Sequence, residues 1–421
     1  MYIDRIVLQN FRSFRKASIE FVHSGRDFEK LGLPSPRFAN VNLLLGNNGF
    51  GKTTLLKAIA LACMGPAVAR AGIYPYRLIR HEPRKAASKS AADAKSRPTQ
   101  AGIQAWFTPH EQDNVPEGVG RLESDVRVRR QGDLEELQWV HADEKPWHPI
   151  FSAESDAMFF VGYGASRRVE QRERFDSGQR RSRVFARAQR VQSLFEDTYS
   201  LVPLSSWLPA YAAQNKGRFA QVVDTLKALT GKGHYQFTGE LEAGEYLFER
   251  EGLRVPFPAL SDGYRAYLGW IGDLLYHVCM TCPPGKKLVE NRGIVMVDEI
   301  DLHLHPKWQM DVLPTLAKAL PNLQFIVTSH SPLIVGSLEW MNIVTMKAAS
   351  AQASTLARIR DAVHGLDADQ VLLTEFFGLE TTRAQGPRRA IKALSLKARH
   401  GDSEAAKRLL EQMTQGVEPA P

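Results

Sequence analysis

The residues with the most specific chemistry in this 421-residue chain form a run that matches G-x-x-x-x-G-K-[ST]. The run follows an apolar segment at residues 41–45 and precedes a helix-like segment at residues 54–63, so the expected order is strand, loop, helix. Glycines let successive backbone N–H groups point inward, and the start of a helix adds partial positive charge, so this order favours phosphate binding. The predicted contacts are Gly46, Asn47, Asn48, Gly49, Phe50, Gly51, Lys52 and Thr53.

Two side chains of this glycine-rich loop carry the charge and the metal-binding oxygen that such chemistry needs. Lys52 is predicted to reach the β and γ phosphates of a nucleotide as a point charge. The hydroxyl group of Thr53 is predicted to bind Mg²⁺. A glycine-rich turn with a chance lysine is the alternative, and the strand and helix on either side argue against it.

Two further apolar runs end in residues that could complete a hydrolytic site. The strand candidate at residues 293–299 ends in two acids, Asp298 and Glu299. Asp298 is predicted to hold Mg²⁺, and Glu299 to orient or deprotonate the attacking water. His330 follows the strand candidate at residues 324–328 and could hydrogen-bond the γ-phosphate. Acids also occur at strand ends by chance, so this interpretation depends on the glycine-rich loop.

A third segment, residues 260–264, opens a helix candidate whose apolar residues recur at three- and four-residue steps. Ser261 is its predicted N-cap, and Gly263 follows in the first turn. A helix start of this kind exposes N–H groups and a dipole to a phosphate. An ordinary capped helix is the alternative, and the segment alone favours that alternative.

Composition narrows the class of protein. With 43% hydrophobic residues, one elaborated domain or two domains can have a core. Lysine and arginine number 54 against 46 acidic residues, and the net charge of +8 permits contact with DNA or RNA. Three cysteines cannot form a disulfide framework, and neither a signal peptide nor an apolar stretch near the roughly 20 residues of a bilayer helix is recognised. A cytoplasmic protein without membrane contact is expected.

Residues 166–190 contain nine arginines and three acidic residues. A solvated surface is one interpretation of this segment. The alternatives are a face that follows the phosphates of DNA or RNA, and arginines that meet the nucleotide itself. Arg167 comes soon after the strand candidate at residues 158–163, where a loop could reach the nucleotide.

The remaining pattern predicts a β-rich and helical region in the middle of the chain and a basic helical tail. Strand candidates lie at residues 2–11, 17–22, 103–107, 126–130, 137–141, 234–238 and 245–250. Helical periodicity extends over residues 192–229 with breaks at Pro203 and Pro209, and the tail has helix candidates at residues 368–377, 387–399 and 403–413.

The motifs as an ordered set resemble the ABC-type ATPases of the RecF, SMC and OLD groups, in particular the compact ATPases of bacterial antiphage systems such as Septu and PARIS. The resemblance rests on the glycine-rich loop, L-S-D-G-Y at residues 260–264, V-M-V-D-E at 295–299, D-L-H-L-H-P at 301–306 and T-S-H-S-P at 328–332. It implies that residues 46–54 are the Walker A loop, which adds Thr54 to the nucleotide contacts. It also implies that residues 260–264 are the signature, Asp298 and Glu299 the Walker B acids, residues 301–305 the D-loop and His330 the switch histidine.

The same resemblance implies an α/β fold, an ABC-type P-loop ATPase head with a mixed sheet, an inserted β-rich and helical lobe and a helical C-terminal tail. The expected parts are residues 1–66 and 255–350 for the head, 67–254 for the lobe and 351–421 for the tail. ATP and Mg²⁺ are the implied cofactors, with Lys52, Glu299 and His330 as catalytic residues. A head-to-head homodimer or higher oligomer is implied, in which Ser261 and Gly263 of one chain meet the γ-phosphate bound by the other.

Three functions follow as hypotheses from the resemblance: a defence sensor that controls a separate nuclease or toxin, a RecF-like DNA-binding repair ATPase, and a nucleotide-locked scaffold with little turnover. The chain departs from the family pattern at the third and fifth signature positions, and Gln100 and Gln104 are weak candidates for a Q-loop. A zinc site at Cys279 and Cys282 with His277 is an alternative that lacks a second ligand pair. His303 and His305 could also bind a metal, although their place in the D-loop favours a structural role at a dimer interface.

Overall fold

The computed structural model describes residues 1–70, 72–73, 76–81, 98–140, 144–151, 157–169, 186–230, 235–350, 353–382, 385–399 and 402–414. The chain divides into two compact units, Met1–Gly365 and Leu366–Pro421. Each unit is described by itself.

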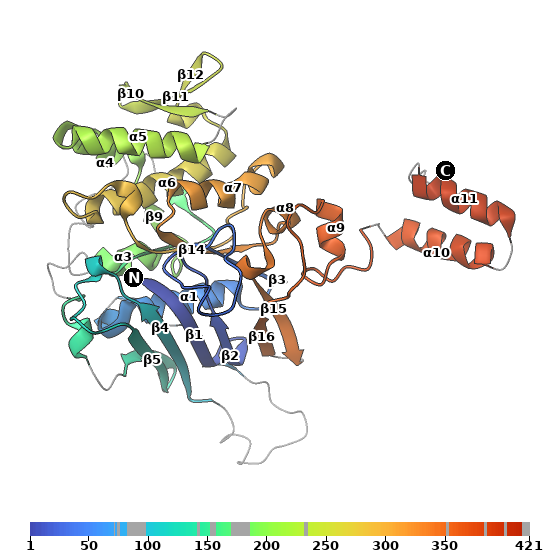
Figure 1. Ribbon diagram of the computed structural model, residues 1–421, viewed down its shortest axis with the longest axis horizontal. Coiled ribbons are helices and arrows are strands. Elements are labelled where there is room, and N and C mark those ends of the chain that lie inside the picture. The colour runs from blue at the N-terminus through green and yellow to red at the C-terminus, as the bar shows by residue number, and fades with distance from the viewer. Residues whose placement is uncertain are drawn as a thin grey trace. The chain divides into compact units, whose positions relative to one another are not determined.

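A six-stranded sheet forms the centre of the first unit, in the order β16-β15-β3-β14-β13-β7 (Figure 1). The strands are β3 (Val41–Gly46), β7 (Phe159–Tyr163), β13 (Gly293–Val297), β14 (Leu323–Ser329), β15 (Ile343–Ser350) and β16 (Ala353–Ala357). All neighbours pair in parallel except β15 and β16. Every residue of β7, β13 and β14 is buried, as expected for parallel strands covered on both faces. Parallel pairing brings the carboxyl ends of β3, β13, β14 and β7 to one edge.

A second, antiparallel sheet has the order β2-β1-β4-β5-β6. Its strands are β1 (Tyr2–Phe11), β2 (Phe14–Glu20), β4 (Gln100–Thr108), β5 (Leu122–Gln131) and β6 (Leu134–Trp139). Burial alternates along β4 and β5, so one face of this sheet supplies core residues. Helix α1 (Lys52–Met64) packs against strands of both sheets and is buried on nearly all sides.

Buried side-chain amides join the two sheets. Gln324 on β14 donates to the carbonyl oxygens of Ile3 (2.9 Å) and Val22 (3.0 Å) and accepts from the N–H of Ile3 (2.9 Å). Asn42 on β3 pairs with both backbone groups of Val22 at 2.8 Å. Because a buried amide without partners is costly, these bonds specify how the sheets meet.

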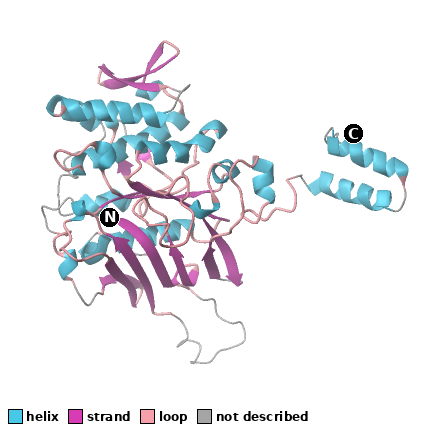
Figure 2. Ribbon diagram, viewed as in Figure 1, coloured by secondary structure: helices cyan, strands magenta, loops and turns pink. Residues whose placement is uncertain are grey.

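Helices and two small sheets complete the first unit. Figure 2 shows helices gathered on one side of the central sheet, with the three-stranded sheet beyond α5. The helices are α3 (Ala186–Gln192), α4 (Leu204–Gln214), α5 (Lys216–Thr230), α6 (Asp262–Thr281), α7 (Pro306–Ala319) and α8 (Pro332–Gly336). The small sheets are β10 (Gln236–Glu242), β11 (Glu245–Arg250) and β12 (Leu253–Pro256), and the pair β8 (Arg168–Val169) with β9 (Ser200–Leu201).

The middle of the chain is not set apart in space as the predicted lobe at residues 67–254. Its strands β4, β5 and β6 extend the sheet that β1 begins, and β7 forms an edge of the central sheet. Hydrogen bonding between β1 and β4 explains this placement, because the edge of β1 opposite β2 would otherwise leave a row of unpaired backbone groups. Of the described residues in this region, those of α4, α5 and β10 to β12 lie beyond the two large sheets (Figure 1).

The second unit contains α9 (Ala368–Leu373), α10 (Gln385–Arg399) and α11 (Ser403–Thr414). Helices α10 and α11 lie side by side as a hairpin (Figure 1). The unit begins later than the predicted boundary at residue 351, because β16 lies within the predicted tail and pairs with β15.

One apolar window contradicts the expectation that no stretch approaches the length of a bilayer helix. Residues Lys52–Ala69 satisfy length and hydropathy criteria for a membrane span. However, 72% of that window is buried within the protein, and it contains α1 of the core. Burial between two sheets explains its apolar character.

Alanine substitutions at Gly49 and Gly51 should separate the cost of a left-handed backbone from the cost of a steric clash in the glycine-rich loop. Gly49 (φ +83°) and Gly51 (φ +98°) both occupy the left-handed region, where a side chain costs about 1–2 kcal/mol. A Cβ atom at Gly51 would also lie 2.2 Å from the hydroxyl oxygen of Ser13, whereas one at Gly49 meets no described atom within 4 Å. Gly51→Ala should therefore lower the thermal unfolding midpoint of the nucleotide-free protein more than Gly49→Ala. Equal shifts would contradict the steric argument.

Candidate functional site

The glycine-rich loop connects the carboxyl end of β3 to the start of α1. Gly51 is the N-cap of α1, and the first turn of this helix contains no acidic residue. Asn47, Asn48 and Gly49 are exposed, and Phe50 packs against the core. The helix start therefore offers free N–H groups and a partial positive charge, which suit an anion.

Lys52 folds back over this loop. Its ammonium group donates to the carbonyl oxygens of Gly46 (2.7 Å) and Asn47 (3.4 Å). Burial lowers the pKa of Lys52, and the carboxylates of Asp298 and Glu299 oppose that shift. Because both of these partners are neutral carbonyl groups, the ammonium group can exchange one of them for a phosphate oxygen.

Asp298 connects the loop to the central strands. Its carboxylate accepts from the hydroxyl groups of Thr53 (2.7 Å) and Thr328 (2.6 Å), and the residue is 5% exposed. The Thr53 hydroxyl and the Asp298 carboxylate are thus close enough to face one cation. Hard oxygen donors of this kind fit Mg²⁺. Thr54, the last predicted contact, is buried at the base of α1.

Glu299 follows in a left-handed conformation with φ +48°. Its N–H donates to the hydroxyl oxygen of Thr328 at 2.7 Å, and its side chain is half-buried. A non-glycine residue in this region is unusual, and such conformations concentrate at functional sites. Thr328 therefore positions both acids, a role that the sequence analysis did not assign to it.

His330 lies after β14, as predicted. Its Nε2 atom and the Oδ1 atom of Asp301 are buried without a hydrogen-bond partner in the described part of the chain. Burial is the main cause that lowers the pKa of His330, and Lys52 adds to it, so the imidazole is neutral near pH 7. Partners are expected for such buried polar atoms, so they fit a polar ligand at the edge where β3 and β14 end.

Arg167, in the segment that follows β7, reaches the turn formed by Asp298 and Glu299, the acidic turn. Its guanidinium group donates to the carbonyl oxygens of Asp298 (3.2 Å) and Glu299 (2.8 Å). It therefore contacts the backbone of the turn, whereas the sequence suggested a contact with the nucleotide. Other arginines of the basic segment, Arg172, Arg174, Arg180, Arg181 and Arg183, lie outside the described residues.

The predicted signature lies at the start of α6. Ser261 is the N-cap, but its side chain makes no capping hydrogen bond. A Cβ atom at Gly263 would lie 2.5 Å from the carbonyl oxygen of His303, so only glycine permits this approach of α6 to the predicted D-loop. Among the described residues, no hydrogen bond or ion pair joins Ser261 or Gly263 to residues 46–54.

The structure gives little support to the alternative metal sites at Cys279 and Cys282 or at His303 and His305. Cys282 donates its thiol to backbone carbonyl groups, and His305 caps α7 by accepting from the N–H of Lys307 at 3.3 Å. Within the described residues, no group of three or more histidine, cysteine, aspartate or glutamate side chains could hold a metal ion. Gln104 lies on β4, where it donates to Asp125.

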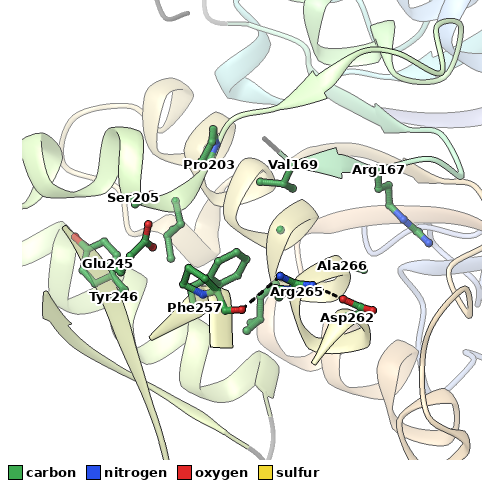
Figure 3. A pocket seen from close by; sticks show the side chains of 14 residues that line it. Arg167, Val169, Pro203, Ser205, Glu245, Tyr246, Phe257, Asp262, Arg265 and Ala266 are labelled. Carbon is green, nitrogen blue, oxygen red and sulfur yellow. Dashed lines mark hydrogen bonds and ion pairs between the residues drawn. The ribbon is translucent and has the colours of Figure 1, made fainter. Parts of the chain in front are cut away.

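A cavity of about 410 Å³ lies beside the first turns of α6 (Figure 3). Apolar residues such as Val169, Leu204 and Phe257 line it together with Arg265. Arg265 donates to the carbonyl oxygen of Pro258 and pairs with Asp262. Arg167 lines the end opposite Glu245 and Tyr246 (Figure 3).

Comparison with known proteins gives relatives with partial coverage. Septu protein PtuA of Bacillus mycoides is 24% identical over 387 residues, which are 90% of this chain and 45% of PtuA. The Retron Ec83 probable ATPase of Escherichia coli is 30% identical over 37% of this chain and 29% of its own length. The SMC head domain from Thermotoga maritima aligns with 85% of this chain and 99% of its own at 15% identity, with a TM-score of 0.42. The chain thus spans less than half the length of either sequence relative.

Two family models match the chain. The model described as "AAA ATPase domain" matches residues 1–63. The model described as "AAA domain, putative AbiEii toxin, Type IV TA system" matches residues 41–336, which is more than half of the chain. The matched residues include the glycine-rich loop and the two acids Asp298 and Glu299. The chain therefore belongs to this family of AAA-type ATPase domains.

Proposed function

We propose that this protein binds ATP and hydrolyses it to ADP and phosphate. The observation that carries the proposal is the hydrogen bond between the Thr53 hydroxyl and the Asp298 carboxylate, which joins the glycine-rich loop to the acidic turn. Lys52 and the N–H groups of the loop bind the phosphates. Thr53 and Asp298 would hold Mg²⁺, which would neutralise phosphate charge when bound.

Glu299 then accepts a proton from the water that attacks the γ-phosphate. His330 is neutral and its Nε2 atom lacks a partner among the described residues, so it can hydrogen-bond the γ-phosphate and sense its presence. These roles require the ends of β13 and β14 to be adjacent to that of β3, and the pairing of β14 with both strands supports this.

We further propose that the active form is a head-to-head homodimer. Ser261 at the start of α6 is exposed, and within the described part of the chain its side chain makes neither a capping hydrogen bond nor a hydrogen bond to its own glycine-rich loop. In a dimer, Ser261 and Gly263 would face the γ-phosphate bound by the partner's loop. Hydrolysis would remove that contact and loosen the pair, which makes the dimer a switch.

The cellular role that we propose is a cytoplasmic defence sensor that controls a separate nuclease or toxin. The relatives named as a Septu protein and as retron ATPases support this role. The chain spans 45% of the length of PtuA, so the partnership with an effector is proposed for this chain and not carried over from its longer relatives.

Substitution of Lys52 and Glu299 should give two different losses. Lys52→Ala should weaken ATP binding, because the charge facing the phosphates is removed. Glu299→Gln should leave binding intact and slow hydrolysis by on the order of 10²-fold or more, because the base is lost. Nucleotide binding and steady-state phosphate release measure the two effects. Full turnover by Glu299→Gln would remove Glu299 from its proposed role.

Mixing two inactive variants tests the shared site. Lys52→Ala and Ser261→Arg homodimers should each be inactive, since both of their sites lack one half. A heterodimer keeps one complete site, so an equal mixture with free exchange should recover about a quarter of wild-type turnover. Absence of recovery in verified heterodimers, with a wild-type protein that stays monomeric in ATP by light scattering, would contradict the dimer.

A further inference from the structure

Arg167 is an arginine in an unusual environment. Its side chain is 6% exposed, and its backbone has φ +30°. Burial lowers its pKa to about 10, and the carboxylates of Asp298, Asp301 and Glu299 oppose the shift. Burying a cation costs free energy unless its N–H groups are hydrogen-bonded.

Arg167 donates hydrogen bonds to two consecutive carbonyl groups of the acidic turn. The guanidinium fork bridges the carbonyl oxygens of Asp298 (3.2 Å) and Glu299 (2.8 Å). The backbone N–H of Glu299 donates to the hydroxyl oxygen of Thr328 at 2.7 Å. The backbone is therefore fixed both before and after the Glu299 Cα atom, which has the left-handed φ of +48°.

We propose that Arg167 is a positioning residue that holds the Glu299 carboxylate in the direction needed for hydrolysis. The inference rests on the proposed role of Glu299. Two parallel planar donors fix the orientation of a peptide turn better than a single point charge does. Small displacements of a catalytic base are expected to reduce kcat strongly, because the base must meet its proton at hydrogen-bond distance.

The position of Arg167 in the wall of the cavity makes the proposal unusually testable (Figure 3). Truncation to alanine would extend this cavity of about 410 Å³ toward the acidic turn. A small guanidinium ion could then enter and restore the missing donors. Ethylguanidinium matches the atoms that Arg167→Ala removes.

Arg218 provides a matched control. Its guanidinium group also bridges two consecutive carbonyl oxygens, those of Cys282 (3.0 Å) and Pro283 (2.6 Å). Neither carbonyl belongs to the acidic turn. Arg218→Ala thus removes the same type of interaction without affecting Glu299.

The experiment measures ATP hydrolysis by the full-length variants. Arg167→Ala should lower kcat by about 10- to 100-fold and change KM by less than about 3-fold, since the phosphate contacts remain. Arg167→Lys should have an intermediate kcat, and ethylguanidinium should raise kcat of Arg167→Ala but not of Glu299→Gln. Arg218→Ala should keep the wild-type kcat.

A double-mutant cycle separates positioning from a general loss of structure. If Arg167 acts through Glu299, Arg167→Ala should reduce the residual turnover of Glu299→Gln by less than about 2-fold. Additive losses, or an equal loss in Arg218→Ala, would overturn the proposal. So would wild-type kcat in Arg167→Lys and Arg167→Ala while Glu299→Gln is inactive. Wild-type turnover by Glu299→Gln would instead refute the proposed function itself.

Discussion

The carboxylate of Asp298 accepts hydrogen bonds from two threonine hydroxyl groups that belong to different parts of the chain. Thr53 lies 245 residues before Asp298, and Thr328 lies 30 residues after it. An ionised buried carboxylate is stable only when its oxygens have donors, so the start of α1 and the end of β14 must both approach β13. The arrangement of the loop, the acidic turn and His330 depends on this constraint.

The topology of the central sheet brings Thr53, Asp298 and Thr328 together through neighbouring strands. Parallel strands β3, β14 and β13 are direct neighbours, so all three end at one edge. The segment that follows the adjacent β7 contributes Arg167 at the same edge, and the close approach at Gly263 brings the start of α6 to residue 303. The site is therefore assembled from short loops on rigid strands, which suits chemistry that depends on position.

Local patterns predict much of this architecture from the sequence, and the predicted ATPase family and α/β fold are confirmed. Strands β1 and β11 have their predicted bounds, because apolar and β-branched runs with clear ends leave little choice, whereas β13 ends at Val297, before the two acids that the predicted strand included. Pro209 is not a break as expected, since burial of Trp207 and Leu208 outweighs its local cost within α4. The role of Arg167 could not be predicted, because it depends on the long-range pairing of β7 with β13. The roles of the site residues stay predictions.

The hydrogen bonds of the side-chain amides that join the two sheets also constrain the order in which the chain can fold. Gln324 is 321 residues from Ile3, and within the described residues β3 pairs with β14 and β15, which both come late in the chain. During synthesis, β1 and β2 can form a hairpin early, whereas the strand before the glycine-rich loop has no sheet partner until β14 has left the ribosome. Over that interval β3 lacks its sheet partners, and α1 lacks the cover of the central sheet although β4 and β5 can already pack against it. Nascent chains of this protein should therefore depend on chaperones until almost the entire first unit has been made.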